Sequence, residues 1–299
     1  MNKVIVIVGP TCTGKTKLSI ELAKKYNGEI INADSTQIYK NNDVATAKIL
    51  SNEMEGIKHY LLSIKNLSED YTVYDYQKDA RRCIKEIISK GKVPILVGGT
   101  GLYIKAVLYD YKFDVITKKN NKYDDYNDEE LFKKLLEVDP NTNIHPNNRR
   151  RVERALDYYF TNNKPMSSKE KADKMLYDAI IIGLTTDRNI LYEKINERVD
   201  KMMDNGLLEE ARKIYESGIR TKAVLTPIGY KELFSYFEGK ESLNNSIEIM
   251  KQNSRHYAKR QYTWFLHQMN VKWFNVDYSD FSITINEITK YIEEGNIYV

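Results

Sequence analysis

The sequence is poor in cysteine and histidine and contains no long apolar run. Its two cysteines, Cys12 and Cys83, cannot provide a disulfide framework, which favours a reducing, cytoplasmic environment. Its four histidines lack the spacing of metal ligands, so we expect no zinc site. No apolar stretch approaches the length of a membrane span, and a predicted strand begins too early to leave room for a signal peptide. The sequence therefore predicts a cytoplasmic protein without a membrane partner.

Size and charge leave several function classes open. The chain has 299 residues, enough for one large domain or two modest ones. A hydrophobic share of 41% and a charged share of 29% are typical of a folded globular protein. The net charge of +4 is only weak evidence for a nucleic-acid partner. The clustering of basic residues in particular stretches is more informative.

The most informative motif is residues 9–16, which match the phosphate-binding loop pattern G-x-x-x-x-G-K-[ST] at every fixed position. The loop consists of Gly9, Pro10, Thr11, Cys12, Thr13, Gly14, Lys15 and Thr16. An apolar run at residues 3–8 predicts a strand before it, and a predicted amphipathic helix follows it. Backbone amides and the helix dipole favour phosphate there, Lys15 adds positive charge, and the Thr16 hydroxyl can hold Mg²⁺. The alternative is an ordinary glycine turn, and the motif does not identify the polyphosphate.

Two further predicted strands end in residues that belong at the same edge of a parallel sheet. Residues 29–33 form a strand that ends at Asp34, and ligands bind outside the carboxyl ends of such strands. Asp34 is therefore a candidate site residue, although it could equally cap the next turn. Residues 93–97 form a strand that leads into Gly98, Gly99 and Thr100, where P-loop ATPases commonly carry a Mg²⁺-binding acid. This glycine-rich turn is either a second anion-binding element or simply a tight turn.

The composition shifts after residue 109. Asp, Asn, Lys and Tyr dominate residues 110–148, which indicates an insertion with one helix near residues 131–138. Four arginines follow within six residues, and they either face solvent or contact nucleic-acid phosphates. Residues 251–268 mix basic and aromatic side chains, which suits RNA but also suits an amphipathic helix that buries its aromatic rings.

Arg198 lies on a predicted helix that begins at Asp187. It stands between Glu197 and Asp200, where a surface ion pair is the simpler interpretation.

Together these elements predict an α/β fold, a P-loop-containing parallel sheet flanked by helices, with a small helical insertion and additional C-terminal helices. The predicted catalytic core comprises residues 1–109 and 147–299, and the insertion comprises residues 110–146. Further strands are expected at residues 59–64, 178–184 and 271–274.

The motifs, taken in order, resemble the tRNA dimethylallyltransferase family, also called the tRNA isopentenyltransferases. The matching segments are residues 9–16, 34–39, 46–48, 97–103, 144–148, 151–156, 229–232 and 257–264. The resemblance implies transfer of a dimethylallyl group from dimethylallyl diphosphate to N6 of the adenosine 3′ of the anticodon in tRNA. It implies Mg²⁺, the tRNA anticodon stem-loop as a partner and action as a monomer. A prenyl diphosphate in the loop would account for the missing acid after Val97.

The resemblance also implies residue roles. Asp34 would act as the general base, while Lys15, Thr16 with Mg²⁺, Thr100 and Arg198 would stabilise the departing diphosphate. The segments expected to contact tRNA contain Asp34, Ser35, Thr36, Gln37, Arg150, Arg151, Val152, Glu153, Arg154, Gly229, Tyr230 and Lys231. The insertion is shorter than is usual in the family and lacks a clear counterpart of a tRNA-contacting arginine, for which Lys118, Lys119 and Lys122 could substitute.

Two other functions fit parts of the sequence. A P-loop kinase or NTPase would transfer phosphoryl groups from ATP and would use Asp34 near Mg²⁺. A non-catalytic, GTPase-like RNA-binding module is the second.

Overall fold

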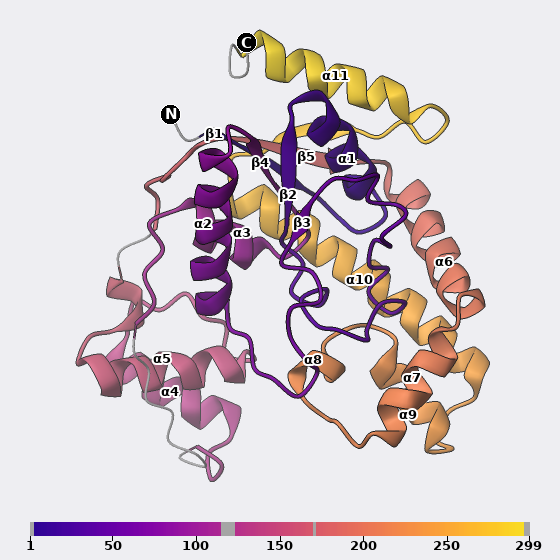
Figure 1. Ribbon diagram of the computed structural model, residues 1–299. Helices are drawn as coiled ribbons and strands as arrows, with labels where there is room; N and C mark the ends of the chain where they lie inside the picture. The colour runs from indigo at the N-terminus through magenta and orange to yellow at the C-terminus, as the bar shows by residue number, and fades with distance from the viewer. Residues whose placement is uncertain (1–2, 115–122, 170–171, 296–299) are drawn as a thin grey trace. The chain divides into compact units, whose positions relative to one another are not determined.

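The computed structural model describes residues 3–114, 123–169 and 172–295 (Figure 1). The chain divides into two compact units, a larger one of Met1–Tyr109 with Met175–Val299 and a smaller one of Asp110–Lys174. In the described ranges, no helix is both long and apolar enough to cross a membrane. The predicted basic cluster of Lys118, Lys119 and Lys122 lies outside the described residues.

The larger unit is built on one six-stranded sheet with the order β3-β2-β4-β1-β5-β6, and all neighbours are parallel. The strands are β1 (Lys3–Val8), β2 (Gly28–Asn32), β3 (His59–Tyr60), β4 (Val93–Val97), β5 (Asp178–Thr185) and β6 (Lys272–Asn275). Because β1 lies between β4 and β5, and β2 lies next to β4, the loops after β1, β2 and β4 leave the sheet at the same edge. The predicted parallel α/β sheet is confirmed.

Helices cover both faces of the sheet because its central strand is apolar on both sides. Val4, Val6 and Val8 belong to one buried cluster, whereas Ile5 and Ile7 belong to another, and all five are fully buried. The first cluster includes residues of α2 (Val73–Ser89), α3 (Gly101–Leu108), α6 (Arg188–Asp204), α7 (Leu207–Glu216), α8 (Lys222–Leu225), α9 (Tyr230–Phe237) and α10 (Leu243–Gln268). The second includes residues of α1 (Lys15–Lys25) and α11 (Phe281–Glu294), which lie side by side in Figure 1.

One strand is shorter than the sequence predicts. We expected residues 59–64 to be extended, but β3 ends at Tyr60. Leu61 and Ser63 have φ values of 60° and 51°, in the left-handed region, so the chain turns out of the sheet there. The alternation of apolar residues could not reveal this, because it reports burial and not backbone conformation.

The smaller unit contains α4 (Asp128–Val138), α5 (Arg149–Asn162) and the short 3₁₀ helix η1 (Met166–Ser168). Leu131 and Leu135 of α4 pack with Val152 and Leu156 of α5 in one buried cluster. The unit therefore begins at residue 110, as predicted, but it extends past the predicted end at residue 146. The apolar stripe of α5 completes the core of the insertion, which neither helix could bury alone.

Candidate active site

The loop after β1 wraps back on itself. Thr13 Oγ1 and Lys15 Nζ both donate to the carbonyl oxygen of Pro10, at 2.9 and 2.5 Å. Gly9 has a φ of +136°, and a Cβ there would lie 2.4 Å from the carbonyl oxygen of Leu184, so no larger residue fits. This arrangement places Lys15 at the N-terminus of α1, where the helix dipole also favours an anion.

The surroundings of Lys15 disfavour its charged form. Burial, and next the positive charge of Arg198, lower the pKa of Lys15 to about 8. Two cations that repel each other in one cavity are stabilised by a bound anion.

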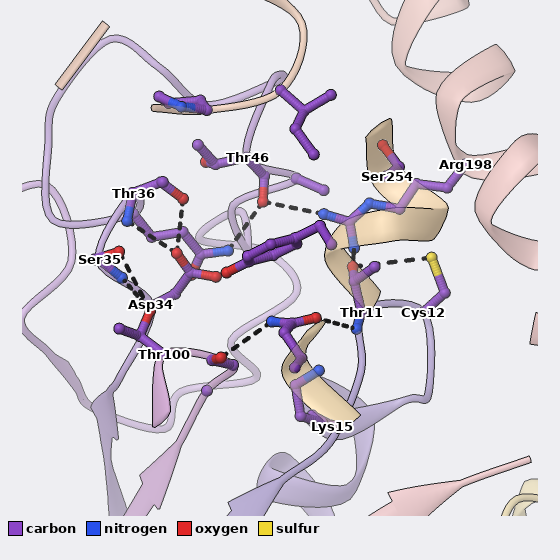
Figure 2. A pocket seen from close by; sticks show the side chains of 18 of the residues that line it. Thr11, Cys12, Lys15, Asp34, Ser35, Thr36, Thr46, Thr100, Arg198 and Ser254 are labelled. Carbon is purple, nitrogen blue, oxygen red and sulfur yellow. Dashed lines mark hydrogen bonds between the residues drawn. The ribbon is translucent and has the colours of Figure 1, made fainter. Parts of the chain in front are cut away.

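A cavity of about 610 Å³ opens at the carboxyl edge of the sheet, within the larger unit. Its walls come from the loops after β1, β2 and β4 and from α6 and α10 (Figure 2). It brings together the predicted residues Thr11, Cys12, Thr13, Gly14, Lys15, Thr16, Asp34, Ser35, Thr36, Gln37, Thr100 and Arg198. The volume lies in the ~300–1,000 Å³ range of small-ligand sites. Residues distant in sequence therefore converge as expected from parallel-strand topology.

Asp34 is held by its own loop. Its Oδ1 accepts hydrogen bonds from the amide and the hydroxyl of Thr36, at 2.9 and 2.6 Å. Asn32, which is buried, exchanges two further hydrogen bonds with the backbone of Asp34. In the described part of the chain, Oδ2 makes no hydrogen bond, and the residue lines the cavity (Figure 2). A fixed carboxylate with one oxygen available can accept a proton from a bound substrate.

Thr100 connects the second glycine turn to the Asp34 loop. Its Oγ1 accepts from the amide of Ser35 at 3.0 Å and donates to Ser35 Oγ at 3.2 Å. Thr100 also precedes α3 as its N-cap residue. The hydroxyl therefore both lines the cavity and positions the residue next to Asp34.

Arg198 points across to the phosphate-binding loop and not to its neighbours in sequence (Figure 2). Its guanidinium donates to Thr11 Oγ1 at 2.7 Å and to the carbonyl oxygen of Thr46 at 3.3 Å. The two carboxylates beside it on α6 pair elsewhere, with Lys194 and Lys251. The interpretation of Arg198 as a member of a surface ion pair is therefore wrong, because Glu197 and Asp200 pair with other residues and the Arg198 side chain lines the cavity.

Gln261 of α10 joins the two glycine-containing loops, a role the sequence did not indicate. Its Oε1 accepts from the amide of Thr11 at 2.9 Å, and its Nε2 donates to the carbonyl oxygen of Gly99 at 3.1 Å. The side chain is 5% exposed. A Cβ on Gly99 would lie 1.9 Å from Nε2, so glycine is required for this contact. The available signals were the matching segment at residues 257–264, which contains Gln261, and the spacing of Tyr257 and Gln261, which share one helix face and both line the cavity.

Glu210 of α7 is a second residue that sequence reasoning missed. Its carboxylate accepts from the amides of Asp43, Val44 and Ala45, each at 2.9 Å. Tyr230 donates to the same carboxylate at 2.7 Å. These contacts fix the loop whose Thr46 carbonyl receives Arg198.

The predicted tRNA-contacting segments differ in exposure. Ser35, Thr36 and Gln37 line the cavity. Tyr230 is fully buried and Val152 is 1% exposed, so neither side chain lies on the surface of the protein. In the same segments Gly229 is buried as the N-cap of α9, and Glu153 pairs with Arg149. The exposed members are Arg150, Arg151, Arg154 and Lys231.

The parallel sheet, the loop after β1 and the glycine turn after β4 define the class, an α/β protein whose cavity combines two glycine-containing loops with a carboxylate. A model of the IPP transferase family matches residues 37–268. The tRNA dimethylallyltransferase of Anoxybacillus flavithermus is 50% identical over 301 residues, covering 98% of this chain and 96% of the relative. The chain therefore belongs to the IPP transferase family.

Solved structures agree with this assignment. The tRNA isopentenylpyrophosphate transferase of Staphylococcus epidermidis has a TM-score of 0.75 and 43% identity, with 98% of this chain and 99% of that chain covered. A eukaryotic dimethylallyltransferase crystallised while acting on tRNA has a TM-score of 0.84 and 31% identity, and the match covers 99% of this chain and 79% of that one.

Proposed function

We propose that this protein transfers a dimethylallyl group from dimethylallyl diphosphate to N6 of the adenosine 3′ of the anticodon in tRNA, and releases diphosphate. Membership of a family whose relatives are named tRNA dimethylallyltransferases supports the reaction type. The observation that carries the assignment to this cavity is that one carboxylate, Asp34, shares it with the cations Lys15 and Arg198.

The chemistry requires a base and a stabilised leaving group. The bond from N6 to the first prenyl carbon forms while the bond from that carbon to the diphosphate oxygen breaks. Asp34 takes the proton that N6 loses, which suits a carboxylate with one oxygen unoccupied. Lys15 and Arg198 balance the negative charge that develops on the diphosphate. Both therefore stabilise the transition state more than the bound substrate.

The cavity also offers apolar surface for the prenyl group. Ile195, Val199, Met202 and Met250 line it together with the phosphate-binding loop. A cavity with an anion-binding end and an apolar wall suits a prenyl diphosphate better than a nucleoside triphosphate. The kinase or NTPase alternative is not favoured, since β4 ends in glycines and not in an acid.

Mg²⁺ fits the donor set as a partly protein-bound ion. In the described residues, no group of three His, Cys, Asp or Glu side chains could hold a metal by itself. Mg²⁺ commonly takes only one or two protein ligands and completes its shell with phosphate oxygens and water. Thr16 lines the cavity at the start of α1 and would hold the ion, which supplies neutralising charge for the diphosphate.

We expect tRNA to be bound through exposed basic residues and the protein to act as a monomer in the cytoplasm. Arg150, Arg151 and Arg154 are exposed on α5, and such side chains contact nucleic-acid phosphates. Both cysteines are free thiols, as a reducing compartment would keep them.

The test is an incubation of the purified protein with Mg²⁺, unmodified tRNA and dimethylallyl diphosphate, followed by mass spectrometry of the nucleosides. We expect an adenosine heavier by one five-carbon prenyl unit, only when the diphosphate is present. Nuclease mapping should place it immediately 3′ of the anticodon. Unmodified adenosine together with phosphoryl transfer from ATP in a parallel reaction would refute the proposal.

A further inference from the structure

The segment that follows β6 returns to the phosphate-binding loop. Residues 277–280 turn into α11, which begins at Phe281. Asp277 and Asp280 organise this turn: Asp277 accepts from the amides of Ser279 and Asp280, and Asp280 caps the helix through the amide of Ser282. The turn is therefore a defined structure, and it presents two aromatic side chains to the loop after β1.

Tyr278 bonds directly to the backbone of the phosphate-binding loop. Its hydroxyl donates to the carbonyl oxygen of Cys12 at 3.0 Å. Burial raises the pKa of Tyr278 to about 12, so the hydroxyl stays protonated and can donate at physiological pH. Cys12 has a φ of 66°, a conformation that L-residues seldom adopt without support. The hydrogen bond thus reaches the loop where its backbone is strained.

Phe281 supports the same loop two residues further on. A Cβ on Gly14 would lie 2.5 Å from Cε2 of Phe281, so the ring lies directly against this glycine. Lys17 lies 5.1 Å from the centre of the same ring. Gly14 is the N-cap of α1, and its φ of +81° sets the direction of the amides that would face a phosphate.

Helix α11 anchors both aromatic residues. Ile288 and Ile292 are fully buried in the cluster that also contains Leu18 and Leu22 of α1. Lys25 and Glu293 form an ion pair at 2.8 Å between the two helices. The turn that carries Tyr278 and Phe281 is thus attached to the helix that follows the phosphate-binding loop (Figure 1).

We propose that Tyr278 and Phe281 are positioning residues of the diphosphate site, which hold the phosphate-binding loop at Cys12 and Gly14 without lining the cavity themselves. Both lie past residue 268, where the match to the family model ends. The inference rests on the proposed function only for the identity of the ligand. The support itself is a property of the free protein. Without the two side chains, the loop should sample other conformations. Part of the free energy of diphosphate binding would then be used to order the loop.

Two measurements separate positioning from general stability. The first is the affinity for inorganic pyrophosphate with Mg²⁺, by calorimetry, together with KM for dimethylallyl diphosphate and for tRNA. The second is the alkylation rate of Cys12 by iodoacetamide without ligand, followed by mass spectrometry of its peptide. The variants are Tyr278→Phe, which removes only the hydroxyl, and Phe281→Ala, with Phe281→Leu as the conservative replacement. Tyr291→Phe is the control, because Tyr291 is on the same helix and packs on Phe274.

We expect Tyr278→Phe to weaken pyrophosphate binding about fivefold, the effect of one lost hydrogen bond. KM for dimethylallyl diphosphate should rise by the same factor, KM for tRNA should not change, and alkylation of Cys12 should accelerate. Phe281→Ala should do the same, and Phe281→Leu should recover part of the loss. Pyrophosphate affinity and alkylation within twofold of the wild type in both Tyr278→Phe and Phe281→Ala would overturn the inference. Alkylation is measured without substrate, so it tests the support even if the wild type proves inactive in prenyl transfer.

Discussion

Replacing Gln261 by methionine tests whether the two loops at the sheet edge work as one site. The amide of Gln261 accepts from the Thr11 amide and donates to the Gly99 carbonyl, and no other hydrogen bond connects those two backbone groups in the described part of the chain. Methionine has a similar length and fills the space, but it can neither donate nor replace the accepting oxygen well. The substitution therefore removes the connection with little change in packing.

The magnitude follows from the two contacts. Each hydrogen bond contributes about 1 kcal/mol net, so we expect a loss of about 2 kcal/mol in the free energy of unfolding. In a chain of this size that lowers Tm by roughly 4 °C. Once the loops are no longer joined, part of the free energy of binding dimethylallyl diphosphate is used to order them. A cost of ~1.4 kcal/mol raises KM for dimethylallyl diphosphate tenfold.

The assay is steady-state prenyl transfer with each substrate varied in turn, alongside thermal unfolding. Gln252→Met is the matched control, since Gln252 is an exposed glutamine on the same helix. We expect Gln261→Met to raise KM for the diphosphate substrate and to leave KM for tRNA near the wild-type value. A lower Tm with an unchanged KM for dimethylallyl diphosphate would refute the reasoning, because Gln261 would then stabilise the fold without positioning the site.

Three further predictions concern the charged groups of the cavity. Asp34→Asn should lower kcat by about 10²–10⁴-fold, as for a lost general base, and keep tRNA affinity in a filter-binding assay; weakened tRNA binding with normal turnover would contradict this role. Pyrophosphate affinity should fall as pH rises through about 8, because the free-enzyme pKa of Lys15 lies there and only the protonated amine attracts the anion. Lys15→Arg, which stays charged, should abolish that step, and a step that persists would come from another group. Arg198→Ala should lower kcat/KM for dimethylallyl diphosphate by about 10²-fold in steady-state kinetics, and an effect under twofold would remove Arg198 from the chemistry.

Much of the fold and part of the site could be predicted from the sequence, because both rest on local signals. The run before Gly9 is apolar from Val4 to Val8, as expected for a strand covered on both faces, and β1 has the predicted bounds. The convergence of Asp34, Thr100 and the phosphate-binding loop follows from the shared edge of parallel strands. These residues are found from sequence because strand direction alone brings them together.

The rest depends on contacts between distant segments. Gln261 joins residues that are 250 and 162 positions away, and nothing in its neighbourhood in sequence announces this. Tyr230 lies in a motif that matches a tRNA-contacting segment, yet its ring is buried in the core and its hydroxyl donates to Glu210. The smaller unit extends past residue 146 and includes α5, whose packing on α4 was concealed by the charged sequence around residue 150.

The central claim is that the cavity transfers a prenyl group and does not cleave a nucleotide. The most direct measurement uses dimethylallyl diphosphate that carries a carbon label in the prenyl group and a phosphorus label in the diphosphate. Our account predicts that the carbon label enters tRNA while the phosphorus label appears as free diphosphate in equal amount, and that Asp34→Asn suppresses both. Release of diphosphate without carbon in tRNA, or phosphorus label in tRNA, would contradict it.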